Sequence, residues 1–249
     1  MAVKSFLYKG NGFAISYEIL NPAQKKDIVF LHGWGSSKAL MKQAFGRTLP
    51  DFRHIYIDMP GFGGSNCDVA LTTEDYAAIM ELLLHEISAS KEIVLGHSFG
   101  GKVATLLNPD LLVLVASAGI QVPKPFKVRV KIALFKILKL TGLTSLRRFF
   151  VAPDAAGMSE AMYQTFKNVV NEDFSEHFKA FKNNALLCFG TTDTATPLWT
   201  GEVIHTLITD SRLVAFEGDH YFLFKEGKLI ADEIEKSCKN LSTENIEMI

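Results

Sequence analysis

The chain has 249 residues, of which 48% are apolar and 21% are charged, and its formal net charge is −1. An apolar share this large excludes a disordered chain, and a net charge this close to zero argues against a general nucleic-acid binder. A chain of this length buries roughly three-quarters of the surface that it exposes when unfolded, so one large core is possible. We therefore expect one main domain that carries an insertion.

The spacing of the cysteines and the length of the apolar stretches indicate in which cellular compartment the protein is expected. Cys67, Cys188 and Cys238 lie far apart and form no C-x-x-C pair, which excludes a disulfide framework and a thiolate zinc site. The first residues show no signal-peptide pattern, and the longest apolar stretch, residues 111–120, is half of the roughly 20 residues that span a bilayer. We expect a cytoplasmic protein without a transmembrane segment.

Short runs of strand-forming residues recur along the chain and predict eight strands. Two runs flank the turn sequence Gly10-Asn11-Gly12, which predicts an opening hairpin. The predicted strands are, in order, residues 3–8, 13–19, 28–31, 54–57, 93–95, 112–116, 186–189 and 213–216. Several of these runs are apolar without alternation, which is typical of strands that are covered on both faces of a parallel sheet.

Helical patterns lie between the strands, and the clearest covers residues 73–87. Its apolar residues recur at the spacing of one helical face, and Thr72 or Thr73 can cap its start. An opening hairpin followed by alternating strands and helices predicts an α/β fold with a mostly parallel sheet and helices on both of its faces.

Residues 121–182 interrupt this alternation and differ from the rest in charge. The segment contains 11 Lys and Arg against 5 Asp and Glu, whereas the rest of the chain contains 15 and 22. Its pattern is helical, without a clear strand. We predict a core formed by residues 1–120 and 183–249, and a helical cap formed by residues 121–182.

One stretch carries a pattern for nucleophilic catalysis. Gly96-His97-Ser98-Phe99-Gly100 is a G-x-S-x-G sequence that lies between a predicted strand and a predicted helix. In such a turn the glycines leave room for a sharp bend, which raises the serine hydroxyl above the end of the sheet. Ser98 is therefore the candidate nucleophile, and a serine that merely caps the helix is the alternative interpretation.

A serine nucleophile needs a base, and the base needs an orienting acid. Asp193 follows the strand at 186–189, and His220 follows the strand at 213–216. The order Ser, Asp, His fits a hydrolase sheet. Asp210 and Asp219 are alternatives for the acid, but Asp219 adjoins the histidine and is poorly placed to reach its ring.

Five stretches of the chain, in order, resemble the α/β-hydrolase fold family. They are Leu31-His32-Gly33-Trp34-Gly35, Asp58-Met59-Pro60-Gly61-Phe62-Gly63-Gly64-Ser65, Gly96-His97-Ser98-Phe99-Gly100-Gly101, Gly190-Thr191-Thr192-Asp193-Thr194-Ala195-Thr196-Pro197 and Gly218-Asp219-His220. The resemblance implies an eight-stranded, mostly parallel sheet with an inserted cap. It also implies that the backbone N–H groups of Trp34 and Phe99 form the oxyanion hole.

The resemblance includes two departures and several bracing residues. The helix after Ser98 is shortened by Asn108-Pro109, and the stretch before Asp193 lacks the proline that is frequent in the family. His32 and His97 lie inside motifs, and we expect them to brace loops by hydrogen bonds. By resemblance, Asp58 also braces a loop.

The predicted function is that of a serine hydrolase, most simply one that cleaves carboxylic esters of small or medium acyl groups through an acyl-enzyme. The Gly33-Trp34-Gly35 form is similar to that of carboxylesterases that act on acyl methyl esters. No metal and no organic cofactor is required. The alternatives are a hydrolase of C–C bonds in vinylogous diketones on the same triad, and a non-catalytic binding protein on a hydrolase fold.

Two further features concern binding partners. Gly96 to Lys102 fits most of a phosphate-binding P-loop, but Val103 stands where that motif needs Ser or Thr, which disfavours nucleotide binding. Eight cationic residues lie between positions 121 and 150 with no acid among them. This basic cap is either a solvated helix face or a landing site for an anionic substrate carrier or membrane surface.

Overall fold

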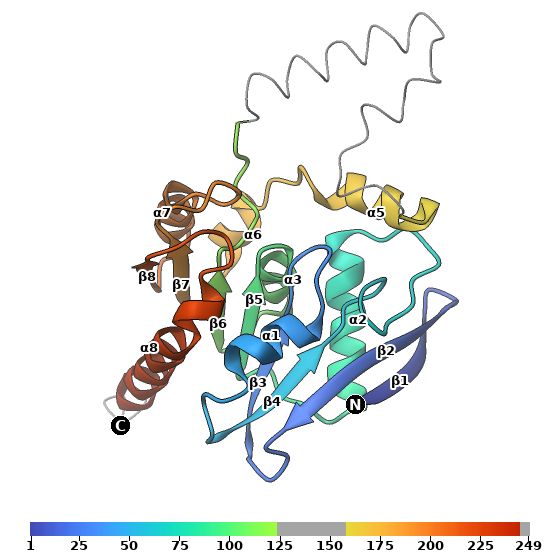
Figure 1. Ribbon diagram of the computed structural model, residues 1–249, viewed down its shortest axis with the longest axis horizontal. Coiled ribbons are helices and arrows are strands. Elements are labelled where there is room, and N and C mark those ends of the chain that lie inside the picture. Colours follow the sequence, from blue (N-terminus) through green and yellow to red (C-terminus); the bar gives the residue numbers. More distant parts are fainter. Residues whose placement is uncertain (124–157, 245–249) are drawn as a thin grey trace, which may run out of the picture.

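A computed structural model describes residues 1–123 and 158–244, and it contains one eight-stranded sheet (Figure 1). The strand order is β1-β2-β4-β3-β5-β6-β7-β8. The strands are β1 (Ala2–Tyr8), β2 (Asn11–Leu20), β3 (Lys26–Leu31), β4 (Phe52–Ile57), β5 (Ile93–His97), β6 (Leu111–Val115), β7 (Asn184–Gly190) and β8 (Ser211–Phe216). From β4 to β8 in this order all neighbours run parallel, and the pairings of β2 with β1 and with β4 are antiparallel. The predicted α/β fold with a mostly parallel, eight-stranded sheet is confirmed.

The opening hairpin turns one residue earlier than the sequence indicates. Tyr8 pairs with Asn11, so the two-residue loop is Lys9-Gly10, and Asn11 already belongs to β2. Both loop residues have positive φ, 48° and 79°. A two-residue loop with positive φ at both positions matches the twist of the flanking strands, although a lysine rarely adopts positive φ.

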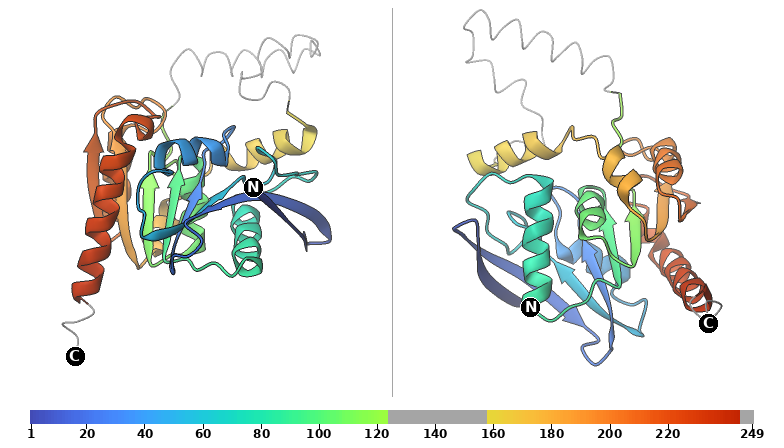
Figure 2. Two further views of the ribbon diagram at one scale, coloured as in Figure 1. Left: turned by 60° about the horizontal axis from the view of Figure 1, so that its bottom comes forward. Right: turned by 180° about the vertical axis from the view of Figure 1, so that it is seen from behind.

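Helices cover both faces of the sheet, as predicted (Figures 1 and 2). The described helices are α1 (Lys38–Phe45), α2 (Thr73–Glu86), α3 (Phe99–Leu107), α5 (Glu160–Val169), α6 (Ser175–Ala180), α7 (Leu198–Leu207) and α8 (Leu223–Glu244). Buried residues of α1 and α8 pack in one core cluster, and those of α2, α3 and α6 pack in another. The sheet is thus buried on both sides, which explains why its central strands are apolar without alternation.

Two helices near the site begin and end as their sequences indicate. Thr72 caps α2, and Asp75 completes a capping box by accepting a hydrogen bond from the Thr72 N–H. The shortened helix after Ser98 ends at Leu107 because Asn108 adopts the left-handed conformation, with φ 50°, directly before Pro109.

The predicted insertion lies between β6 and β7, which are neighbours in the sheet. Its described part contains α5 and α6. The cationic residues predicted to form the basic cap fall in positions 124–148, which lie outside the described residues. Within the described parts of the chain, no helix is both long and apolar enough to cross a membrane.

Candidate active site

The predicted site residues follow different strands of the sheet. Ser98 follows β5, Asp193 lies in the loop after β7, and His220 lies in the loop after β8. Trp34 lies in the loop after β3. All four therefore lie at the carboxyl edge of the parallel strands, which is where open α/β sheets bind their ligands.

The backbone of Ser98 adopts a rare conformation for a non-glycine residue, with φ 52° and ψ −116°. Three backbone hydrogen bonds hold it there: the Ser98 N–H donates to Val115 O at 3.1 Å, and Ser98 O accepts from Gly101 and Ala118 at 3.0 and 3.1 Å. The hydroxyl caps no helix N–H, so the helix-capping interpretation of this serine is wrong. Strained residues of this kind cluster at functional sites, where the surrounding structure enforces them.

The glycines that flank Ser98 are required by close backbone approach. A Cβ on Gly96 would lie 2.3 Å from the carbonyl oxygen of Gly100. A Cβ on Gly100 would lie 2.5 Å from the carbonyl oxygen of Leu31. Because backbone atoms cannot yield as a flexible side chain does, no larger residue fits this turn without a rearrangement of the sheet edge.

Asp193 and His220 form a hydrogen-bonded pair. Asp193 Oδ2 lies 2.7 Å from His220 Nδ1, and the Asp193 side chain is buried. Of the two alternative acids, Asp219 accepts instead from the N–H of Tyr221 at 2.9 Å. The structure thus pairs His220 with Asp193, and this arrangement leaves Nε2 of the imidazole as the other ring nitrogen, available for proton transfer.

Several donors hold the Asp193 carboxylate ionised. Its Oδ1 accepts from the backbone N–H groups of Ala195 and Thr196 at 2.7 and 3.0 Å, and its Oδ2 accepts from the Thr196 hydroxyl at 2.8 Å. Burial alone would raise the pKa of Asp193, but the hydrogen bonds from His220 and Thr196 outweigh burial and lower it. The carboxylate can therefore orient an imidazole and stabilise its protonated form.

The predicted nucleophile is not hydrogen-bonded to the predicted base. Within residues 1–123 and 158–244, no hydrogen bond joins Ser98 Oγ to His220. Such contacts are often long without substrate and tighten when it binds. The two residues are linked through His97, whose Nε2 lies 3.0 Å from the carbonyl oxygen of His220.

The two backbone amides predicted to form the oxyanion hole occupy suitable elements. Phe99 is the first residue of α3, so its N–H points out of a helix N-terminus, where negative charge is favoured. Trp34 lies in the loop that follows β3. Its ring packs at 5.7 Å from that of Phe99 and at 5.4 Å from that of Phe166 in α5.

His32 and Asp58 brace the loops beside the site, as expected. His32 accepts a hydrogen bond from the Met59 N–H at 3.1 Å and lies 2.8 Å from the Gly33 oxygen, and burial lowers its pKa to about 4. Asp58 accepts from the N–H groups of Lys38 and Gly64 at 2.7 and 2.8 Å. These bonds fix the loops after β3 and β4 to one another.

The side chain of Lys102 does not serve a P-loop. Its Nζ is buried and donates to Val169 O and to Glu172 Oε2, each at 2.7 Å. Thr73 also donates to Glu172 Oε2, at 2.5 Å. Because Lys102 is engaged with the end of α5, the P-loop interpretation has no structural support.

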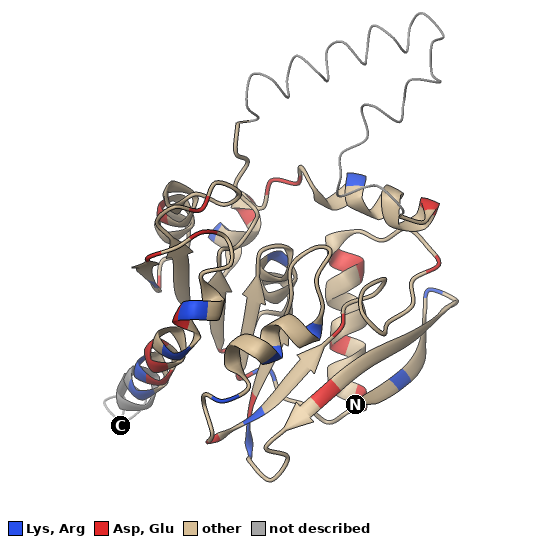
Figure 3. Cartoon of the chain, viewed as in Figure 1, with Lys and Arg blue, Asp and Glu red and all other residues tan. Residues whose placement is uncertain are grey.

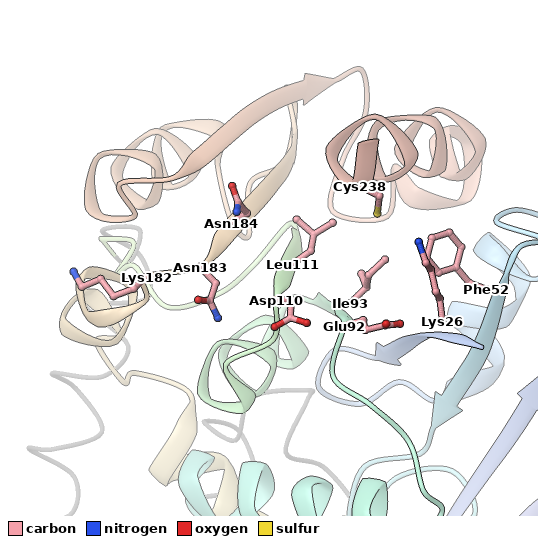
Figure 4. Close-up of a pocket in the computed structure, with 10 residues that line it drawn as sticks. All are labelled: Lys26, Phe52, Glu92, Ile93, Asp110, Leu111, Lys182, Asn183, Asn184 and Cys238. Carbon is pink, nitrogen blue, oxygen red and sulfur yellow. The ribbon is translucent and has the colours of Figure 1, made fainter. Parts of the chain in front are cut away.

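Two clefts among the described residues lie at different places in the fold. One, of about 430 Å³, opens at the amino ends of β3, β5, β6 and β7 (Figure 4). Its charged groups are those of Lys26, Glu92, Asp110 and Lys182. It lies at the edge of the sheet opposite Ser98, so it is no part of this site. Another cleft, of about 530 Å³, lies between the loop at Gly61 and Met162 of α5.

Two residues that support the site could not be identified from the sequence. Thr196 touches both members of the Asp193–His220 pair, and its only sequence signal is a hydroxyl three residues after an aspartate in a strand-end loop. Glu172 gives no local signal, because its partners Lys102 and Thr73 are distant in sequence.

The chain is similar in sequence to curated esterases. Pimeloyl-[acyl-carrier protein] methyl ester esterase from Vibrio campbellii is 42% identical over 82 residues, which are 33% of this chain and 31% of that protein. The chain thus spans about a third of the length of this curated relative.

Solved structures match over nearly the whole chain. The esterase EaEST from Exiguobacterium antarcticum has a TM-score of 0.72 at 22% identity and covers 92% of this chain and 96% of its own. A mutant of the meta-cleavage product hydrolase CumD from Pseudomonas fluorescens has a TM-score of 0.68 at 19% identity, with coverages of 94% and 98%. At these identities the likeness shows the fold alone.

A family model described as the alpha/beta hydrolase family matches residues 28–235, which extend from β3 through most of α8. The matched range includes Trp34, Ser98, Asp193 and His220. Since the match covers most of the sheet and the whole edge that carries these residues, this chain belongs to the alpha/beta hydrolase family.

Proposed function

We propose that this chain hydrolyses carboxylic esters through an acyl-enzyme. The observation that carries the proposal is the buried Asp193–His220 hydrogen bond of 2.7 Å at the same sheet edge as the strained, glycine-flanked Ser98. A serine in this turn, a histidine base and a buried carboxylate are the parts that such chemistry needs.

In the proposed reaction, Ser98 Oγ attacks the ester carbonyl carbon while His220 Nε2 takes the hydroxyl proton. The negative oxygen of the tetrahedral intermediate accepts hydrogen bonds from the amides of Trp34 and Phe99. The C–O bond to the alcohol then breaks, and His220 returns the proton to the leaving alcohol. Water, deprotonated by His220, cleaves the acyl-enzyme to release the acid and Ser98. This sequence of steps uses no metal or organic cofactor.

Active-site labelling tests the nucleophile. A fluorophosphonate probe is expected to label the wild type once and Ser98→Ala not at all, because phosphonylation requires the activated hydroxyl. Ser5→Ala, which changes an exposed serine on β1, serves as the matched control and should be labelled like the wild type. Labelling that persists in Ser98→Ala would contradict the assignment, and an unlabelled wild type would favour a binding protein.

A substrate panel tests the reaction class. We expect turnover of p-nitrophenyl esters of graded chain length and none of vinylogous diketones. Preferential cleavage of a diketone would favour the C–C hydrolase alternative.

We further infer that residues 121–182 form a cap over this site. In the described part of the insertion, Phe166 of α5 packs on Trp34, and a Cβ on Gly61 would lie 2.3 Å from the Met162 sulfur. Figure 2 shows α5 at the edge where the strands end. The apolar residues of α5 favour a substrate with a hydrocarbon acyl group.

The finer proposal concerns a carrier-linked acyl ester as the substrate. The curated relatives are named for methyl esters of an acyl group on a carrier protein. Among the described helices, α8 carries both blue and red residues along its length (Figure 3). The run of eight cations between positions 121 and 150, with no acid among them, supports the proposal, because such a run would attract an anionic carrier.

Charge reversal in the basic cap tests the carrier. Lys127→Glu combined with Arg129→Glu is expected to lower kcat/KM for a carrier-linked acyl ester, mainly through the association rate, and to spare p-nitrophenyl butyrate. The loss should shrink at about 1 M salt, where the Debye length is about 3 Å. An equal loss on both substrates would show that these charges only support the fold of the cap.

A further inference from the structure

His97, the residue before the proposed nucleophile, lies between two loops of the site. It is the last residue of β5, and 1% of it is exposed. Its ring centroid lies 4.9 Å from that of His220, and its Nε2 lies 3.0 Å from the His220 carbonyl oxygen. The side chain of His97 thus contacts the backbone of the proposed base His220, whereas Asp193 holds the ring of His220.

The tautomer of His97 follows from its partners. A carbonyl oxygen can only accept, so Nε2 carries the hydrogen of this bond and Nδ1 is the unprotonated nitrogen. Nδ1 is buried and has no partner among the described residues. Burial, followed by the neighbouring His220, lowers the pKa of His97 to about 3. The ring is therefore neutral near pH 7 and does not exchange protons with substrate.

The other side of the ring faces the loop that follows β3. A Cβ on Gly33 would lie 3.0 Å from His97 Nδ1 and 3.1 Å from the Cβ of Ser98. The ring thus fills the space between Gly33, which precedes Trp34, and the loop that carries His220. One side chain contacts both loops and is covalently adjacent to Ser98.

The loop around His220 has few long-range restraints on its main chain within the described part of the chain. Asp219 is exposed, and Gly218 adopts φ 138°, which few other residues tolerate. Gly218 O accepts a hydrogen bond from the N–H of Thr192 at 3.0 Å, which ties the loop to the one after β7. The bond from His97 ties the main chain of this loop to β5.

We propose that His97 is a positioning residue that holds the main chain of His220 in register with Ser98. Two restraints then define the imidazole: Asp193 fixes its side chain at Nδ1, and His97 fixes its backbone at the carbonyl oxygen. Without the hydrogen bond from His97, the imidazole of His220 can shift while Asp193 still holds its Nδ1. The Nε2 atom of His220 then moves away from Ser98. This inference rests on the proposed function.

Three substitutions separate the hydrogen bond from simple packing. His97→Gln carries an amide N–H about as far from the backbone as Nε2, and His97→Asn carries one only as far as Nδ1. His97→Phe fills the space without a donor. We expect kcat for p-nitrophenyl butyrate to fall by about 10- to 100-fold in the Asn and Phe variants with KM nearly unchanged, since small misplacements of a catalytic group cost about this much. The Gln variant should recover most of kcat.

A buried histidine outside the site provides the control for packing. His54 in β4 is fully buried and bonded to Tyr56 and to the Leu49 carbonyl, so His54→Gln should lower the melting temperature without lowering kcat per folded molecule. If His97→Phe does not fold, the difference in kcat between the Gln and Asn variants still tests whether a donor at the position of Nε2 is needed.

The outcomes distinguish this inference from the proposed function. A folded Gln variant as slow as the Asn variant, or three variants that all retain wild-type kcat, would overturn the positioning role. A wild type that neither hydrolyses the ester nor reacts with a fluorophosphonate would overturn the proposed function and the inference with it. An active wild type with rescue by Gln alone supports both.

Discussion

At the scale of single residues, the hydroxyl of Thr196 has an unusual set of neighbours. It lies 2.8 Å from Asp193 Oδ2, 3.2 Å from His220 Nδ1 and 3.0 Å from the Ala116 carbonyl oxygen. It is buried, so water cannot replace it readily. The Thr196 hydroxyl therefore contacts Oδ2 of Asp193, the oxygen that also faces His220. The backbone N–H groups of Ala195 and Thr196 hold the other oxygen, Oδ1.

Thr196→Val is expected to lower kcat for ester hydrolysis about tenfold with little change in KM. A hydrogen bond to a charged group contributes about 1.5–3 kcal/mol, and tenfold in rate corresponds to about 1.4 kcal/mol. Steady-state kinetics with p-nitrophenyl butyrate measures the change. Thr200→Val is the control, because the Thr200 hydroxyl is bonded to Pro197 and does not touch Asp193. Equal kinetics of the two variants would show that Thr196 has no part in supporting the pair.

The sequence predicted that Ser98, Asp193 and His220 lie at one edge, because each follows a separate predicted strand and parallel strands end at one edge. It predicted that His97 braces a loop by hydrogen bonds, but it could not identify Thr196 or the His220 carbonyl as the partner of His97. Those contacts depend on how closely two loops approach after folding, and no periodicity in the sequence encodes that distance. Identification of the supporting residues therefore needed the folded structure.

At the scale of elements, Glu172 joins three helices. Its carboxylate accepts from Lys102 of α3 and from Thr73 at the start of α2, while Lys102 also donates to Val169 at the end of α5. Lys102 is 2% exposed at its side chain and Glu172 is 22% exposed. Burial lowers the pKa of Lys102, and Glu172 opposes this shift. The pair thus anchors the returning end of the insertion to the core.

Glu172→Ala is expected to destabilise the protein more than Lys102→Met does. Removal of Glu172 leaves a buried ammonium group without its anion, which costs about 3–5 kcal/mol in comparable pairs. Lys102→Met leaves the half-buried carboxylate of Glu172, which still accepts a hydrogen bond from Thr73. The aliphatic side chain of the new methionine keeps the packing of the lysine stem. Urea unfolding measures both free energies of unfolding.

The double variant tests the pairing directly. Lys102→Met combined with Glu172→Ala should be close in stability to Lys102→Met alone, because the buried charge is gone. If the two single losses add in the double variant, the ion pair does not account for the difference.

The elements themselves were largely predictable, and the exceptions have physical causes. Uniformly apolar runs predicted the buried parallel strands, and a threonine cap at Thr72 or Thr73 predicted the start of α2. The hairpin turn was misplaced by one residue because a lysine with positive φ is improbable from propensity alone. Packing of β1 on β2 selects the register and overrides that preference.

At the scale of the whole molecule, three histidines are buried in neutral form. Burial lowers the pKa of His32 to about 4, that of His97 to about 3, and that of His54 below its ordinary value. In the unfolded chain each would bind a proton near pH 6.5. Their neutral state in the fold therefore couples stability to pH.

The sign of this coupling is that acid destabilises the fold. Above about pH 6.5 the folded and unfolded chains bind equally few protons at these sites, so stability is fully present. As pH falls, the histidines bind protons in the unfolded chain but not in the folded one. Each histidine therefore lowers the free energy of unfolding by up to about 1.4 kcal/mol per pH unit, until the pH reaches its pKa in the folded chain. We expect these histidines together to cost about 2–4 kcal/mol between about pH 6 and 5, measured by urea unfolding.

Single substitutions assign this pH dependence. His54→Gln should make the free energy of unfolding fall less steeply between about pH 6 and 5, because the variant lacks the imidazole whose pKa burial lowers. A free energy of unfolding that is constant from about pH 7 to 5 would show that these histidines are protonated in the fold.

The place at which the insertion leaves the sheet has a consequence for how this protein can diverge. The chain exits after β6 and re-enters at β7, its direct neighbour, and the Ala116 N–H donates to Cys188 O at 2.8 Å where the two strands part. Because both ends of the excursion are held side by side, its length enters the closure entropy only logarithmically, by about 0.6 kcal/mol for each doubling. The length of the excursion can accordingly change at a small cost in closure entropy while the strands that carry Ser98 and Asp193 keep their register, provided that the anchor of Glu172 to Lys102 is kept. Under the proposed function, changes that alter substrate selection by the cap and changes that would impair bond cleavage thus fall on separate stretches of the gene.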